Sequence, residues 1–295
     1  MDAPPEREDV RPFIRIAAAL AGFGFGAPRI LAQDVRGGFL LLEDLGDDLY
    51  ARILERGGDE YMLYEAAIDV LRSLHEQPLP PDLPSFDAAR ALREVRLFLE
   101  WTLPALAGKR ADPAAVREFE GLWQASLEPL FSGPQILALF DYHAENLIWL
   151  PARKGLARVG LLDFQDAVAG PPALDVVSLL EDARRDVSAD VVDAMLDRFV
   201  AGKSAAQIEA FRRDYALVGA QRNTRIIGVF GRLFLRDNKP AYLDLMPRVW
   251  RHLENDLQHP ALESVRGWFD RHVPTGWRTA VPDRARFALP EGGKA

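Results

Sequence analysis

The chain has 295 residues, 48% of them hydrophobic and 27% charged, and its 36 Lys and Arg against 44 Asp and Glu give a net charge of −8. This length predicts two compact units, each large enough for a hydrophobic core. The composition excludes a disordered or collagen-like protein. The chain has no cysteine, so disulfide scaffolds, thiolate metal sites and cysteine nucleophiles are excluded as well. The net negative charge argues against nucleic-acid binding, which relies on clustered cationic side chains.

The beginning of the sequence shows no targeting signal. The segment MDAPPEREDVRPF is acidic and contains prolines, unlike a secretion signal. The apolar stretch that follows, Ile16 to Pro28, is shorter than the about 20 residues that a helix needs to span a bilayer. We therefore expect a soluble cytoplasmic protein with no membrane partner.

The first part of the chain predicts one helix followed by two strands. The helix is expected to begin near Pro5–Glu6, where acidic residues complement its macrodipole, and to end at Gly22. The GFGFG segment from Gly22 to Gly26 is interpreted as a helix ending, because it precedes a strand and therefore does not match a phosphate-binding loop. Strands are predicted over Arg29–Ala32 and Gly38–Glu43.

After Gly46 the sequence becomes predominantly helical. Apolar residues recur at helical spacing over Tyr61–Glu76, Ala88–Thr102 and Ala114–Leu127. The chain after Pro172 is again mostly helical, to about Gln258. Trp250, Trp268 and Trp277 are expected to belong to the core.

A short β-hairpin is predicted between the helical regions. Its strands are the apolar runs Leu147–Leu150 and Val159–Leu162, which flank a turn containing Pro and Gly. Pairing Leu150 with Val159 places Asn146 opposite Asp163, since opposed residues of an antiparallel pair have a constant sum of numbers. An amide oxygen and a carboxylate side by side suit Mg²⁺.

Asp141 lies on the loop that leads into the hairpin, five residues before Asn146. An Asp on such a loop, a following Asn and an Asp-Phe after the hairpin are the components of a kinase-type phosphotransfer site. Asp141 would then orient the acceptor hydroxyl and take its proton, while Asn146 and Asp163 hold the metal on the ATP phosphates. The spacing alone equally allows a local role, in which Asp141 and Asn146 cap a turn and Asp163 ends a strand.

Two longer segments carry a family resemblance. FDYHAENLIWL, followed by LLDFQDAVAGPPALDVVSLL, resembles the aminoglycoside phosphotransferase family. The resemblance implies a protein kinase-like α+β fold, with a small antiparallel β lobe and a large, mostly helical lobe. The segments LLLEDLGDDLY, SLLEDARRDV, QRNTRIIGVFGRL and YLDLMPRVWRHLENDLQHP resemble one group within it. Those bacterial kinases phosphorylate the anomeric hydroxyl of N-acetylmuramate and N-acetylglucosamine in cell-wall recycling, using ATP and Mg²⁺.

The resemblance also implies roles for particular residues. Asp141 corresponds to the catalytic base, and Asn146 and Asp163 correspond to the Mg²⁺ ligands. The hinge, whose backbone binds the adenine of ATP, corresponds to Glu43, Asp44 and Leu45. His143 and Asp175 are expected to support the catalytic loop without taking part in the reaction.

Two departures from the family pattern stand out. The family usually has a His two residues before the catalytic Asp, and this chain has Leu139 there. The sequence also begins where the third strand of the smaller lobe would end. We therefore expect residues 1–46 to be the remnant of the nucleotide-binding lobe with its hinge, and residues 47–295 to form the helical lobe. An incomplete lobe predicts poor stability or low activity.

The candidate acceptor residues share a position after the metal site or on a later helix. They are Glu181, Asp182, Arg184, Arg222, Asn223 and Arg225. Their alternative role is that of a solvated helix face. Two other functions stay open from the sequence: a kinase of aminoglycosides or other small-molecule hydroxyls, and a truncated kinase-like binding protein without catalysis.

Overall fold

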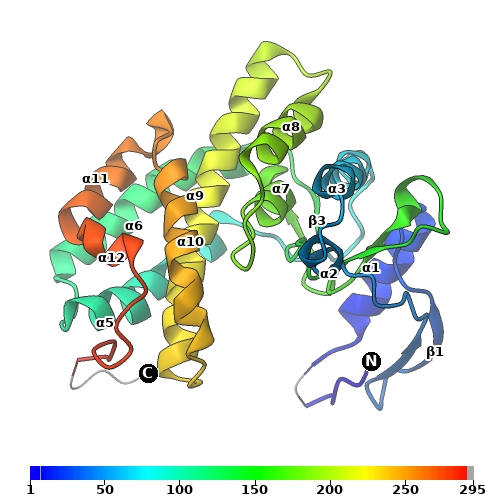
Figure 1. Ribbon diagram of the computed structural model, residues 1–295, viewed down its shortest axis with the longest axis horizontal. Helices are drawn as coiled ribbons and strands as arrows, with labels where there is room; N and C mark the ends of the chain where they lie inside the picture. The colour runs from blue at the N-terminus through cyan, green and yellow to red at the C-terminus, as the bar shows by residue number, and fades with distance from the viewer. Residues whose placement is uncertain (7, 291–295) are drawn as a thin grey trace. The chain divides into compact units, whose positions relative to one another are not determined.

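The computed structural model describes residues 1–6 and 8–290 (Figure 1); residues 291–295, the end of the predicted helical lobe, lie outside it. The described chain forms two compact units. The first comprises Met1–Ser85, Gln135–Asp182 and Val187–Ser204, and the second comprises Phe86–Pro134, Ala183–Asp186 and the chain from Ala205. The predicted boundary at Gly46 falls within the first unit, where Phe13 stacks on Phe164 with ring centroids 4.8 Å apart. No helix in the described ranges is long and apolar enough to cross a membrane.

The first unit combines short strands with five helices in its described residues. Its helices are α1 (Arg11–Gly22), α2 (Tyr50–Glu55), α3 (Glu60–Leu74), α7 (Ala173–Leu180) and α8 (Ala189–Val200). Its strands are β1 (Ile30–Asp34), β2 (Phe39–Leu42), β3 (Ile136–Ala138), β4 (Leu147–Trp149), β5 (Val159–Leu161) and β6 (Val168–Gly170). The strands form three antiparallel pairs, β1–β2, β3–β6 and β4–β5. The two strands predicted before Gly46 are thereby confirmed, and β6 is an addition that the sequence analysis missed.

Helix α1 begins later than predicted. Pro12 has no N–H to donate to the carbonyl of Glu8, so the helix does not extend back toward Glu6. Asp9 instead accepts a hydrogen bond from the Arg11 N–H at 3.0 Å. The predicted end at Gly22 is confirmed: Gly24 adopts a φ of +85° and the Phe25 N–H returns to the Leu20 carbonyl at 2.9 Å.

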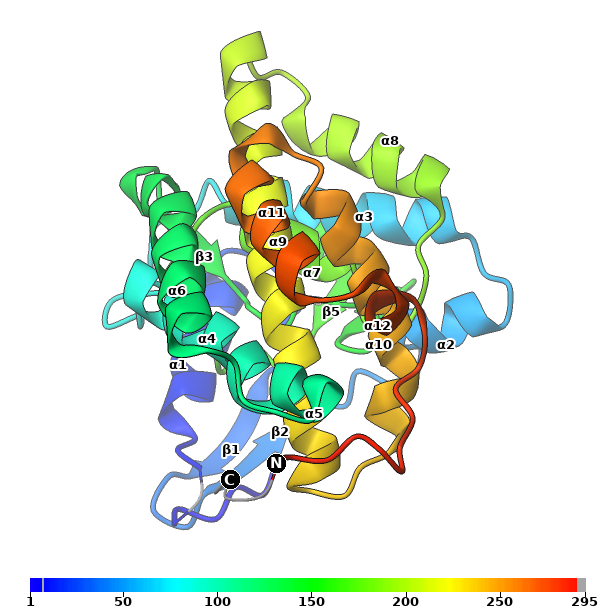
Figure 2. The same cartoon turned by 90° about the vertical axis from the view of Figure 1, so that its left-hand side faces the viewer.

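The β1–β2 pair has one buried and one exposed face. Leu40 is 4% exposed, whereas Phe39 and Leu41 are 52% and 61% exposed. Residues 1–3 run along the edge of β2, where the Leu40 N–H donates to the Met1 carbonyl at 3.1 Å and the Ala3 N–H to the Gly38 carbonyl at 3.0 Å. Figures 1 and 2 both show α1 alongside this pair.

Helix α3 forms the centre of the first unit and confirms the predicted apolar stripe. The residues at its helical spacing are all fully buried: Leu63, Ala67, Val70, Leu71 and Leu74. Its other side contacts α8 through Arg198, whose guanidinium binds both Asp69 carboxylate oxygens at 2.7 Å. This bidentate pair fixes the two helices against each other.

The register of the β4–β5 hairpin differs from the prediction by one residue. Trp149 pairs with Val159 and Leu147 with Leu161, so the predicted pairing of Leu150 with Val159 is wrong. Alternating hydrophobicity carries no register information here, because β5 is buried on both faces. The register is set by the 3₁₀ turn η3 (Gly155–Arg158), after which the Leu150 N–H donates to the Arg158 carbonyl at 2.8 Å.

The second unit is helical in its described residues. Its elements are α4 (Ala88–Leu97), the π-helical turn η1 (Phe98–Thr102), α5 (Leu103–Ala107), α6 (Pro113–Leu127), the 3₁₀ turn η2 (Glu128–Ser132), α9 (Ala205–Leu235), α10 (Ala241–Asp256), the 3₁₀ turn η4 (Pro260–Leu262), α11 (Glu263–His272) and α12 (Thr275–Thr279). Figures 1 and 2 show the long helices α9 and α10 side by side. Trp250 and Trp268 are buried in an aromatic core with Phe98, Phe119 and Phe269, as expected for core residues.

The predicted helix over Ala88–Thr102 changes to π-helical geometry at Phe98. Pro104 has no N–H for the carbonyl four residues earlier, and the Leu103 N–H donates to the Phe98 carbonyl instead, closing the wider turn. Helix α9 approaches this turn closely. A Cβ at Gly228 would lie 2.5 Å from backbone atoms of Leu97 and Phe98, and the Thr102 hydroxyl donates to the Ile227 carbonyl at 2.7 Å.

The close approach at Gly228 predicts an inverted response to alanine. Gly→Ala in a helix normally stabilises by about 0.5–1 kcal/mol, and Gly121→Ala on α6 should do so because nothing lies within 4 Å of its Cβ position. Gly228→Ala should instead lower the free energy of unfolding by roughly 1–3 kcal/mol, since backbone atoms must move. Urea unfolding of the two variants checks this, and equal effects would contradict the packing.

Candidate active site

The loop between β3 and β4 is held by a buried carboxylate. Asp175, on the first turn of α7, is completely buried and accepts hydrogen bonds from the N–H of Leu139 at 2.6 Å and of Phe140 at 2.8 Å. Charge-assisted bonds of this kind are about twice as strong as neutral ones. The carboxylate therefore fixes the backbone of the two residues that precede Asp141.

The chain turns sharply just before Asp141. Phe140 has a φ of +76°, a conformation that is rare for a bulky residue, and the Asp141 N–H donates to the Leu139 carbonyl at 3.0 Å. In the part of the chain that the structure describes, the Asp141 carboxylate has no hydrogen-bond partner, and its residue is only partly buried. A carboxylate that accepts no other hydrogen bond and is reached by solvent can accept a proton from a bound hydroxyl.

Asn146 connects the loop to the hairpin. Its Nδ2 donates to the Asp141 carbonyl at 2.9 Å and lies 3.4 Å from Oδ2 of Asp163. In the observed register Asn146 lies opposite Leu162 and not opposite Asp163, as the Leu162 N–H bond to the Asn146 carbonyl at 3.0 Å shows. The two side chains still meet because Asp163, with a φ of +55°, turns out of the strand.

The hairpin base offers oxygen ligands for one cation. The bond to Asp141 occupies Nδ2 of Asn146, so Oδ1 is the atom left for a metal, together with the Asp163 carboxylate, which Gln165 orients through a bond of 2.7 Å. No group of three or more His, Cys, Asp or Glu suited to a metal occurs among residues 1–6 and 8–290. Two protein oxygens suit Mg²⁺, which is usually completed by water and substrate phosphate.

Two neighbours of Asp141 support the loop from within the first unit. Tyr142 is buried and donates from its hydroxyl to the Ala67 carbonyl of α3 at 2.9 Å, and burial raises the pKa of this phenol well above its usual range. His143 is also buried, with Nε2 3.4 Å from Nδ2 of Asn146. Leu139, at the position of the usual family His, is 2% exposed and belongs to the core.

The candidate hinge residues follow β2 directly. The Glu43 N–H extends the β ladder to the Arg29 carbonyl at 2.8 Å, and its carboxylate binds Arg29 at 3.2 Å and Arg153 at 2.8 Å. Asp44 accepts a bond from the Gly46 N–H at 2.8 Å, in a turn that needs the φ of +80° at Gly46. Among the described residues, the Leu45 N–H has no backbone acceptor.

The candidate acceptor residues divide between the two units. Glu181 and Asp182 belong to the first unit and are buried; the other four belong to the second. Asn223 is completely buried and donates to Asp256 at 3.0 Å, and Arg225 forms an ion pair with Glu94 at 3.5 Å. Arg184 is exposed and Arg222 is half-buried. The alternative role in a solvated helix face is therefore wrong for Glu181, Asp182 and Asn223.

Three residues that contact the first unit's core, Asp163 or the hinge were not singled out from the sequence. Tyr142 and Gln165 are neighbours of the predicted motif residues, and their contacts depend on the folded loop. Arg153 lies in the hairpin turn, 110 positions from Glu43. The only available signal was a basic turn, PARKGLAR, in a chain with an acidic hinge segment.

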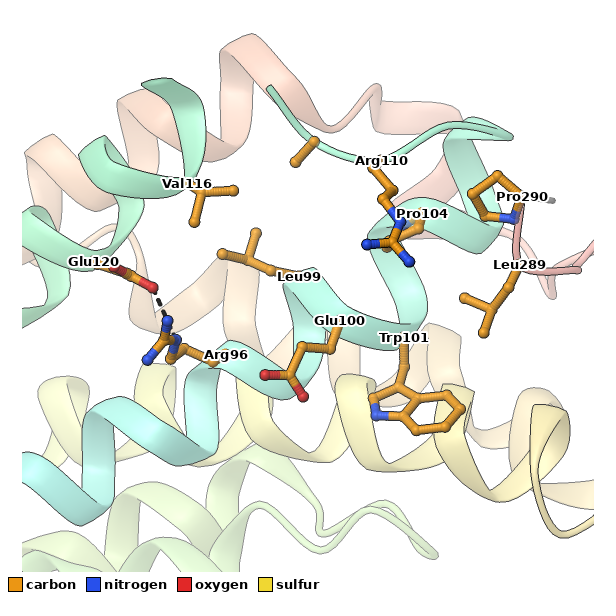
Figure 3. A pocket seen from close by; sticks show the side chains of 11 residues that line it. Arg96, Leu99, Glu100, Trp101, Pro104, Arg110, Val116, Glu120, Leu289 and Pro290 are labelled. Carbon is orange, nitrogen blue, oxygen red and sulfur yellow. Dashed lines mark ion pairs between the residues drawn. The ribbon is translucent and has the colours of Figure 1, made fainter. Parts of the chain in front are cut away.

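A separate cavity of about 390 Å³ lies within the second unit (Figure 3). The turn η1 contributes Leu99, Glu100 and Trp101 to its lining, and Arg96 and Glu120 form an ion pair of 2.8 Å at one side. None of its lining residues is a candidate site residue. The cavity therefore belongs to a different region from the hairpin site.

Comparison with known proteins relates the chain to phosphotransferases. The model of the phosphotransferase enzyme family matches residues 1–217. The chain is 43% identical over 278 residues to the N-acetylmuramate/N-acetylglucosamine kinase of Caulobacter vibrioides, covering 91% of this chain and 76% of that protein. The corresponding kinase of Pseudomonas aeruginosa is 37% identical over 260 residues, with 86% and 75% covered.

The fold is shared with solved kinases. The streptomycin–ATP–APH(2″)-IIa ternary complex superposes with a TM-score of 0.53 at 16% identity, over 85% of this chain and 80% of that chain. The predicted α+β, kinase-like fold class is confirmed by this match and by the small antiparallel pairs next to many helices.

The role of Asp175 can be tested by removing its carboxylate. Asp175→Ala leaves two N–H groups without an acceptor, which should lower the free energy of unfolding by roughly 2–4 kcal/mol. The amides of Leu139 and Phe140 should then exchange their hydrogens faster by about tenfold or more. Asp193→Ala, at an exposed position in the middle of α8, serves as the control and should change stability by less than about 0.5 kcal/mol. Unchanged exchange at Leu139 and Phe140 would contradict the assignment.

Proposed function

The chain belongs to the phosphotransferase enzyme family, and we propose that it is an ATP-dependent kinase of N-acetylmuramate and N-acetylglucosamine. The phosphoryl group would be transferred to the anomeric hydroxyl, giving sugar 1-phosphates. The observation that carries this proposal is the geometry around Asp141, where Asn146 and Asp163 approach to 3.4 Å behind a loop fixed by Asp175. The acceptor assignment is supported by the 43% identity to a kinase of that name over 91% of the chain.

In the proposed reaction, Asp141 orients the acceptor hydroxyl and receives its proton. The hydroxyl oxygen forms a bond to the γ-phosphorus of ATP while the bond between that phosphorus and the β,γ-bridging oxygen breaks, and ADP leaves. Such transfers need positioning and charge stabilisation more than covalent help from the protein. The bonds from Asp175 to Leu139 and Phe140 and the bond from Asn146 to the Asp141 carbonyl supply that positioning.

Asn146 and Asp163 would hold Mg²⁺ through Oδ1 and the carboxylate. A bound Mg²⁺ supplies positive charge that neutralises the ATP phosphates. Gln165 and the Asn146 amide keep the two Asp163 oxygens in place. The backbone of Glu43, Asp44 and Leu45 would bind the adenine, with the Leu45 N–H as a donor.

The predicted acceptor residues remain part of this proposal. N-acetylmuramate carries a lactyl carboxylate, for which arginine is a suitable partner through charge-assisted bonds. Arg184, Arg222 and Arg225 are the cationic candidates, and Glu181, Asp182 and Asn223 are candidates for sugar hydroxyl and amide groups. An aminoglycoside acceptor is the alternative within the same fold, because the net charge of −8 suits a polycation.

The proposal is tested by ³¹P NMR of the protein with Mg²⁺ and ATP in parallel reactions with N-acetylmuramate, N-acetylglucosamine and kanamycin. We expect an acid-labile sugar 1-phosphate signal from both amino sugars and none from kanamycin. Asp141→Asn should lower kcat by about 10²-fold or more, because it removes the base.

Each other result selects a different function. An acid-stable phosphate ester formed only on kanamycin would establish the aminoglycoside kinase. ATP binding with no phosphorylated product, and with Asp141→Asn indistinguishable from the unchanged protein, would favour the binding protein without catalysis.

A further inference from the structure

The turn of the β4–β5 hairpin contacts the hinge through one side chain. Nη2 of Arg153 lies 2.8 Å from Oε1 of Glu43, and the two side chains are 29% and 19% exposed. We propose that Arg153 is a positioning residue for the nucleotide, which holds Glu43 and thereby the hinge backbone where the adenine binds. This inference rests on the proposed use of the hinge by ATP, and Arg153 itself would not touch the reacting atoms.

Both oxygens of the Glu43 carboxylate are engaged. Oε2 accepts from the backbone N–H and from Nε of Arg29, each at 3.2 Å, while Oε1 accepts from Arg153. Burial opposes ionisation of this carboxyl, but the hydrogen bonds from Arg29 and the charge and hydrogen bond of Arg153 outweigh it and lower the pKa of Glu43. The Glu43 carboxylate is therefore ionised at neutral pH. Because Arg29 is 73% exposed, Arg153 is the better-shielded of the two cations.

The contacts of Glu43 determine the path of the hinge backbone. Its N–H donates to the Arg29 carbonyl at 2.8 Å, and Asp44 accepts from the Gly46 N–H at 2.8 Å. Between these bonds lies Leu45, whose side chain packs on the hairpin: a Cβ at Gly160 would lie only 3.2 Å from its Cδ1. A displacement of Glu43 would therefore move the Leu45 N–H, the group that we expect to face the base.

The chain after the hinge continues along the same hairpin. The Trp149 N–H donates to the Asp48 carbonyl at 2.8 Å, and Leu49 forms a β-bridge with Ile148. Asn146 and Asp163 lie at the opposite end of the hairpin from its turn. One hairpin thus connects the hinge, through Arg153, with the proposed metal ligands. A nucleotide bound at both ends would depend on the distance that the hairpin maintains between them.

Lys154 provides a matched control for Arg153. It is the next residue of the same turn, it is exposed, and among the described residues it forms no ion pair. Arg153→Met and Lys154→Met therefore remove the same charge from the same loop. Only the first removes the bond to Glu43, so a difference between them separates positioning from general attraction of the phosphates.

The test combines binding and kinetics on the full chain. Isothermal titration with Mg-ADP and steady-state kinetics should show Kd for the nucleotide and KM for ATP raised about five- to tenfold by Arg153→Met, the effect of one charge-assisted hydrogen bond. kcat and the KM of the acceptor sugar should stay within about twofold. Lys154→Met should match the unchanged protein, and Arg153→Lys should recover part of the affinity.

A double-mutant cycle identifies the partner. Glu43→Gln should raise Kd by at least the same factor, because it weakens the bonds from Arg29 as well as the bond from Arg153. Glu43→Gln with Arg153→Met should be no weaker than Glu43→Gln alone, since both substitutions remove the Glu43–Arg153 ion pair. The midpoint of thermal unfolding should hardly move, because a partly exposed ion pair contributes little to global stability.

Three results would overturn the inference: equal losses from Arg153→Met and Lys154→Met, additive effects of Glu43→Gln and Arg153→Met, or a loss confined to kcat. Failure of the proposed function can be distinguished from failure of this inference. Nucleotide binding with the predicted Arg153 dependence, but without phosphorylation of either sugar, would overturn the acceptor and leave the hinge inference standing. No binding of Mg-ADP to the unchanged protein would overturn the hinge inference as well.

Discussion

The candidate site depends on the buried carboxylate of Asp175. Its two oxygens accept the N–H groups of Leu139 and Phe140, which would otherwise be buried or part-buried without an acceptor. These bonds hold Phe140 in a left-handed conformation that an isolated chain would avoid. This strained turn sets the position of Asp141 and brings the Asp141 carbonyl within hydrogen-bond distance of Asn146. A residue without contact to substrate thus determines where the proposed base and the proposed metal ligand lie.

The hairpin β4–β5 extends this constraint toward the nucleotide. At its base Asn146 and Asp163 approach each other, and at its turn Arg153 binds Glu43. The backbone of Asp48 and Leu49 follows the hairpin between these points. Phosphoryl transfer relies on the relative placement of base, metal and nucleotide. In this account a single hairpin provides the common reference for all three, and the loop that leads into it is held by Asp175 of α7 and, through Tyr142, by α3.

The sequence predicted the local features well and the long-range contacts poorly. Asp141, Asn146 and Asp163 were singled out because kinase-type sites use such residues at a characteristic spacing, and the structure brings the three close together. Helix α3 was predicted because its buried stripe repeats at helical spacing. The hairpin register was missed since β5, buried on both faces, has no polar side to mark it. Asn146 and Asp163 nevertheless lie close together, because the positive φ of Asp163 turns this residue out of the strand. The contact between Arg153 and Glu43 and the burial of Asn223 depend on tertiary packing, which no local sequence pattern encodes.

The most direct test of the central claim is a titration of Mn²⁺, followed by electron paramagnetic resonance, in the presence of a non-hydrolysable ATP analogue. The account predicts one nucleotide-dependent Mn²⁺ site per chain. Asp163→Asn and Asn146→Ala should each weaken it by about tenfold or more, because the first removes the charge of a ligand and the second removes a ligand oxygen. Asp166→Asn, an exposed carboxylate three residues from Asp163, should leave it unchanged. Binding that is insensitive to both Asp163→Asn and Asn146→Ala would contradict the account.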